Sequence, residues 1–122
     1  MTWTDDELLD AVRRALAGAR PAASASGQRG PLSRSWDFAG ADVVHGAIRV
    51  FFTVGPNRWA LWAVDYSLDD LPAGPNTGAP CDSAAEWAGE IWTDMDEQID
   101  TGALLRAQRS IGPDGVALVR WR

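Results

Sequence analysis

Apolar side chains recur at helical spacing near the start of the chain. Leu8, Leu9, Val12 and Leu16 make up this first apolar stripe. Thr4 and Glu7 stand three residues apart just before the stripe, which is the spacing of a capping box. The pattern therefore predicts a helix over residues 3–17. Residues 18–34 have no period and consist mostly of Ala, Ser, Gly, Arg and Pro, so we expect a flexible loop there.

The middle of the chain changes to a period of two, which is typical of strands. Residues 47–54 and 59–66 are rich in β-branched and aromatic side chains. Between them, Gly55-Pro56-Asn57-Arg58 supplies turn chemistry, which predicts a hairpin. Trp36 to Phe38 also alternates, and Asp42 to His45 is a further short strand candidate.

Helical spacing returns after a loop rich in Pro and Gly. The second apolar stripe comprises Ala84, Ala88, Ile91, Trp92, Met95 and Ile99. Ser83 and Glu86 again have capping-box spacing, and Thr101-Gly102 ends the pattern. Residues 103–109 and 116–121 then flank a turn at 110–115, which predicts a second hairpin. The expected fold is a single α+β domain over 1–122, with an antiparallel four- to five-stranded sheet, two packed helices and the order α-β-β(-β)-α-β-β.

Charge narrows the classes of partner. The 122-residue chain has a formal net charge of −6 and contains no lysine, a bias that fits a GC-rich bacterial genome. Such acidity argues against nucleic-acid binding, which needs a basic face, and is compatible with a basic protein partner. No membrane span or signal peptide is evident, so the expected location is the cytoplasm, as a monomer or homodimer.

Four carboxylates follow helical spacing on the second predicted helix. They are Glu86, Glu90, Asp94 and Glu97. Together they predict one acidic stripe opposite the apolar stripe, with like charges that repel one another. Three interpretations stay open: a solvated face, a surface for a basic partner or for the arginines of the C-terminal segment, and a cation site.

Catalytic and metal chemistry find little support in the residue pattern. Asp94 and Asp96 point apart on a helix, and neither they nor Asp69-Asp70 match a calcium loop, so we expect no metal and no cofactor. Cys81 rules out an intrachain disulfide because it is the only cysteine. His45 and Cys81 could form a nucleophile pair only if the fold brought them together, and we expect no catalytic residue.

The surplus of apolar residues on the central hairpin predicts an uncovered sheet face. If both helices pack on one side, either Arg49, Phe51 and Thr53 or Trp62 and Tyr66 lie on the other. Trp62 and Tyr66 therefore join the four carboxylates as partner-binding candidates. The profile is that of a small non-catalytic protein-binding domain, such as the immunity proteins that neutralise basic toxins. The alternative is a small-molecule-binding or enzymatic domain that uses the sheet face, Trp side chains and Asp65, Asp69 or Asp70.

Overall fold

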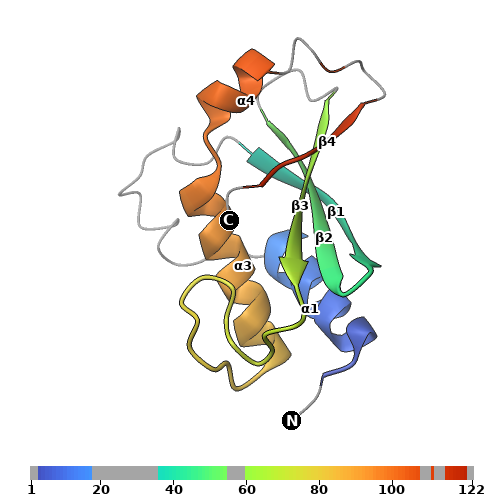
Figure 1. Cartoon of the computed structure of the whole chain (residues 1–122), viewed down its shortest axis with the longest axis vertical. Helices are drawn as coiled ribbons and strands as arrows, with labels where there is room; N and C mark the ends of the chain where they lie inside the picture. The colour runs from blue at the N-terminus through green and yellow to red at the C-terminus, as the bar shows by residue number, and fades with distance from the viewer. Residues whose placement is uncertain (1–2, 18–35, 55–59, 108–110, 112–114, 121–122) are drawn as a thin grey trace.

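The fold combines a four-stranded sheet with helices, and is α+β as the sequence predicts (Figure 1). The computed structural model describes residues 3–17, 36–54, 60–107, 111 and 115–120. Its elements are α1 (Asp5–Ala17), β1 (Trp36–Val44), β2 (Ala47–Val54), β3 (Leu61–Ser67), α3 (Ala84–Gln98), α4 (Thr101–Ala107) and β4 (Val116–Leu118). The predicted flexible loop at 18–34 and the turn at 55–58 lie outside the described residues.

The sheet is mixed, so the prediction of a purely antiparallel sheet is wrong. The strand order is β1-β2-β3-β4, with antiparallel β1–β2 and β2–β3 pairs and a parallel β3–β4 pair. The chain leaves β3, runs through α3 and α4, and returns beside β3. A helical crossover of this kind brings the next strand back in the same direction, whereas a tight hairpin reverses it.

The predicted C-terminal hairpin is also wrong, because its first strand is helical. Residues 101–107 form α4, and the element order is therefore α-β-β-β-α-α-β. Asp100 accepts a hydrogen bond at Oδ1 from the Ala103 N–H, at 3.0 Å, as an N-terminal cap does. The Ala, Leu and Arg residues that follow are strong helix formers, so local preference and the cap together favour the helix.

One face of the sheet carries the core. Ile48, Val50 and Phe52 of β2 are fully buried and alternate with half-buried residues along the strand. Leu8 and Val12 of α1 and Ile91 and Met95 of α3 belong to the same buried cluster. The Trp36 ring meets Phe52 edge-on, with centroids 6.3 Å apart. Both predicted apolar stripes therefore pack on the same side of the sheet.

The strand register decides which residues lie on the other side. Phe52 pairs with Trp62 and Ile48 with Tyr66, so both aromatic side chains share the core face. Arg49 pairs with Asp65 and Phe51 with Ala63, and these residues lie on the opposite face. We call that side, with its half-buried Arg49, Phe51, Thr53 and Asp65 and its exposed Val116 and Leu118, the open face.

The two edge strands differ in length and regularity. At one edge, the β1–β2 register shifts between Phe38 and Gly40, so Ala39 bulges out of the ladder. At the other edge, β4 contributes only three residues.

Among the described helices, none combines the length and the apolar character needed to cross a bilayer.

Candidate functional site

Asp94 does not lie on an exposed acidic stripe, which corrects the prediction for α3. Its side chain is fully buried. The Tyr66 hydroxyl donates a hydrogen bond to Asp94 Oδ2 at 2.7 Å, linking β3 to the middle of α3. Two residues on, Asp96 Oδ1 accepts a hydrogen bond from the Trp36 indole N–H at 3.3 Å. A buried carboxylate is tolerated when it is hydrogen-bonded, so these acids fasten α3 to the sheet.

Glu90 also points into the protein and organises the loop before α3. Its Oε1 accepts hydrogen bonds from the backbone N–H groups of Asn76 and Thr77, at 3.1 and 2.9 Å. The Thr77 hydroxyl lies 3.1 Å from both carboxylate oxygens. Burial alone would raise the pKa of Glu90, but the hydrogen bonds from Thr77 and Asn76 prevail and lower it.

The loop approaches Glu90 so closely that residue 74 has no room for a side chain. A Cβ atom at Gly74 would overlap the Glu90 carboxylate. The loop is further held by backbone hydrogen bonds from Gly74 N–H to Ala79 O and from Cys81 N–H to Pro72 O, at 2.8 and 2.9 Å. Thus the segment that the sequence marks only as a loop has a defined conformation, set by a helix residue.

Two of the four predicted stripe residues remain at the surface. Glu86 and Glu97 are exposed, and Glu86 accepts a hydrogen bond from the Asp82 N–H at 3.3 Å beside the Ser83 cap. Trp62 and Tyr66 have only 4% and 2% of their surface exposed. Of the two alternatives for the uncovered face, the one with Trp62 and Tyr66 is therefore wrong, since the register turns these side chains toward the helices; Arg49, Phe51 and Thr53 lie on that face. Partner binding by Glu86 and Glu97 stays a prediction.

His45 and Cys81 are not joined by any contact among the described residues. His45 is exposed in the turn between β1 and β2, whereas Cys81 is buried before α3. Burial, followed by the nearby Glu90 carboxylate, raises the pKa of the Cys81 thiol to about 11. Such a thiol is almost entirely protonated at neutral pH and hence a poor nucleophile. Within the described ranges, no three His, Cys, Asp or Glu side chains gather closely enough to hold a metal.

The three aspartates proposed for a ligand site lie near the end of β3. Asp65 is on the open face and forms a two-bond ion pair with Arg49, at 2.7 and 2.9 Å. The hydrogen bond and charge of Asp65 raise the pKa of Arg49. Asp69 and Asp70 follow the strand and are exposed.

Exposed carboxylates gather where α1 and α3 begin and β3 ends. They are Asp5, Asp6, Glu7 and Asp10 on α1, Asp69 and Asp70 after β3, and Asp82 and Glu86 around the start of α3. We call these eight residues the acidic end; Figure 1 shows the starts of α1 and α3 and the chain after β3 in the lower part of the view.

Several contacts bring the parts of the acidic end together. Asp5 borders the same surface hollow as His45 and Gly46 in the β1–β2 turn. The Leu68 N–H donates to Gly46 O at 2.8 Å, which ties this turn to the chain after β3. Glu7 and Asp10 share a second hollow with Ala84 and Ala85 at the start of α3. Three segments far apart in sequence therefore present one acidic surface.

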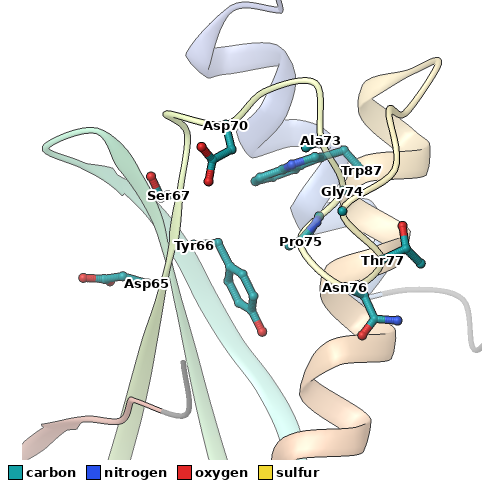
Figure 2. A pocket seen from close by; sticks show the side chains of 11 residues that line it. Asp65, Tyr66, Ser67, Asp70, Ala73, Gly74, Pro75, Asn76, Thr77 and Trp87 are labelled. Atoms are coloured by element: carbon teal, nitrogen blue, oxygen red, sulfur yellow. The ribbon is translucent and has the colours of Figure 1, made fainter.

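A pocket of about 690 Å³ lies between the end of β3, the following loop and α3 (Figure 2). Its walls are Asp65, Tyr66, Ser67, Asp70, residues 73–78 and Trp87. In Figure 2, Asp70 lies above Tyr66 in the loop after β3, and its carboxylate points away from Trp87, toward the side of Ser67. Nothing in the local sequence pattern marks Trp87 or Gly74 as part of a pocket.

Comparisons with family models, with curated proteins and with solved structures found no match to this chain. The geometry of the acidic end and of the adjoining pocket is therefore the basis for assigning a function.

Proposed function

We propose that the chain is a protein-binding domain that takes a basic protein partner on its acidic end. The observation that carries the proposal is the convergence of eight exposed carboxylates from α1, the chain after β3 and the start of α3. Arg13 and Arg14 lie on α1, which carries four of these carboxylates. Arg14 pairs with Asp10 at 3.0 Å and Arg13 donates to Ala41 O at 3.1 Å.

Electrostatics supports such a partner in two ways. The net charge of −6 draws cationic proteins toward the chain and speeds their association. The local concentration of carboxylates then gives the encounter a preferred orientation. An immunity-type inhibitor that acts in the cytoplasm on a basic toxin would use both effects. The surface differs from the acidic stripe on α3, because Glu90 and Asp94 serve the fold.

The alternative of a ligand site on the sheet face has less support. Stacking on a sugar or base requires an accessible ring face, and Trp62 and Tyr66 are buried against the helices. Asp65 already forms an ion pair with Arg49 on the open face. We therefore favour protein recognition at the acidic end.

The test compares two variants that each remove two negative charges. Asp6→Asn with Asp69→Asn changes the acidic end, and Glu97→Gln with Asp100→Asn changes exposed sites outside it. Asn at position 100 keeps the capping oxygen for α4. The wild-type chain is immobilised, proteins retained from a lysate of the source organism are identified, and the main partner is purified for titration.

We expect the partner to be basic. At low ionic strength, the acidic-end variant should bind it about tenfold more weakly than the wild-type chain does, and the matched variant should change the affinity about twofold at most. Added salt should weaken wild-type binding toward the level of the acidic-end variant. Equal affinity of the two variants, an acidic partner, or no retained protein would contradict the proposal.

A further inference from the structure

We infer that the pocket beside the acidic end receives an arginine side chain of the partner. This inference rests on the proposed function, because the pocket opens next to Asp69 and Asp70 of the acidic end. It adds a specific recognition site to what is otherwise a diffuse electrostatic surface.

The lining of the pocket favours a cation. Among the described residues, the lining includes two carboxylates, Asp65 and Asp70, and no Arg, Lys or His side chain. Asp65 already forms an ion pair with Arg49 on the open face. Asp70 is therefore the lining carboxylate that can bind a cationic group at the mouth of the pocket. Asp70 is exposed and belongs to the lining of the pocket. A cationic group would gain a charge-assisted hydrogen bond there.

The shape and the other walls favour a guanidinium at the end of an alkyl chain. Ala73 and Pro75 are half-buried members of the lining, and methylene groups can pack along their apolar side chains. Ser67, Asn76 and Thr77 add polar side chains around the rim. A guanidinium has five donors in a planar fork and can bind a carboxylate through two bonds, whereas an ammonium acts as a point charge. An arginine side chain therefore matches both the apolar side chains and the carboxylate of the pocket lining.

The loop that forms the far wall is held in advance of binding. Glu90 fixes the backbone at Asn76 and Thr77, and Gly74 lies against the Glu90 carboxylate. A wall that is already ordered loses little conformational entropy when a ligand enters. The inward-pointing Glu90 thereby contributes to recognition without touching the partner.

The experiment titrates the full chain with short blocked peptides that contain one arginine, one citrulline or one lysine. Citrulline has nearly the shape of arginine but no charge. Binding is followed by NMR, through the backbone amides of Ser67, Asp70 and Thr77 and the indole N–H of Trp87. Asp70→Asn is compared with its neighbour Asp69→Asn, which removes the same charge from a residue outside the pocket lining.

We expect the arginine peptide to shift the pocket resonances and the citrulline peptide to leave them unchanged. Asp70→Asn should weaken arginine binding about tenfold, and Asp69→Asn about twofold or less. Equal effects of the two variants, shifts spread over α1 instead of the pocket, or equal binding of lysine and arginine would overturn the inference. Loss of partner binding in the Asp6/Asp69 variant together with normal binding by Asp70→Asn would overturn the pocket assignment alone.

Discussion

Helices α1 and α3 both carry several carboxylates, but they use them in opposite ways. On α1, Asp5, Asp6, Glu7 and Asp10 are all exposed. On α3, Asp94 is buried against Tyr66, and Glu90 is turned toward the preceding loop. Helical spacing alone does not separate the two cases. A carboxylate becomes part of the fold when another element presents donors to it, and remains available to a partner when none does.

Asp94 should give the largest effect on stability. Asp94→Ala removes the acceptor of the buried Tyr66 hydroxyl and leaves a cavity, so we expect a loss of about 3 kcal/mol in the free energy of unfolding. Tyr66→Phe should cost about 2 kcal/mol, because the buried carboxylate loses a donor. Urea unfolding of both single variants and the double variant measures the coupling between the two residues.

Glu97→Ala is the matched control for Asp94, since Glu97 is an exposed acid on the same helix. Its effect on stability should stay within about 0.5 kcal/mol. Equal costs at positions 94 and 97 would mean that α3 does not use its buried acid to hold the sheet.

Glu90 should give an intermediate and pH-dependent effect. Glu90→Gln keeps one acceptor oxygen but loses the charge, so about 1 kcal/mol of stability should be lost at pH 7. Folding lowers the pKa of Glu90, so the contribution of its charge is fully present above the unfolded pKa, near 4.3. It is lost as the pH falls through the lower folded pKa.

The difference between wild type and Glu90→Gln should therefore shrink in acid. Urea unfolding at pH 7 and at pH 3 measures it. A difference that stays constant or grows in acid would contradict the account of the Glu90 hydrogen bonds.

Substitutions on α1 should affect stability least. Asp10 and Arg14 form an ion pair at 3.0 Å, but 60% and 80% of their side-chain surfaces are exposed. Asp10→Ala should thus change the free energy of unfolding by about 0.5 kcal/mol or less, with a smaller change at high salt. Thermal unfolding at low and high salt measures this change in stability. A loss of stability comparable to that of Asp94→Ala would contradict the proposed difference between α1 and α3.

The elements that depend on neighbours in the sequence were predictable. The capping box of α1 is present, with Thr4 N–H to Glu7 at 3.2 Å and Glu7 N–H to Thr4 Oγ1 at 3.1 Å. The Ser83 cap of α3 and the strand at 47–54 also occur where the sequence predicts them. Each of these features results from residues within one or two turns of one another, which a local pattern can capture.

What the sequence missed depends on contacts between distant segments. The direction of β4 follows from the path through α3 and α4, which no local signal contains. The burial of Asp94 depends on Tyr66, 28 residues earlier in the chain. Which face of β3 is covered depends on the register with β2, where a shift of one residue would exchange Tyr66 for Asp65. The pocket joins the end of β3, residues 73–78 and Trp87 of α3, so its residues could not be grouped by a local pattern.

The bulge at Ala39 and the short β4 bear on how the chain can associate with other proteins. A strand that added to β1 would meet a hydrogen-bonding ladder interrupted between Phe38 and Gly40, and at β4 it would find only three residues to pair with. Both edges therefore discourage the strand-by-strand growth that leads to aggregation. Association through side chains, as at the acidic end, leaves the sheet of each partner intact.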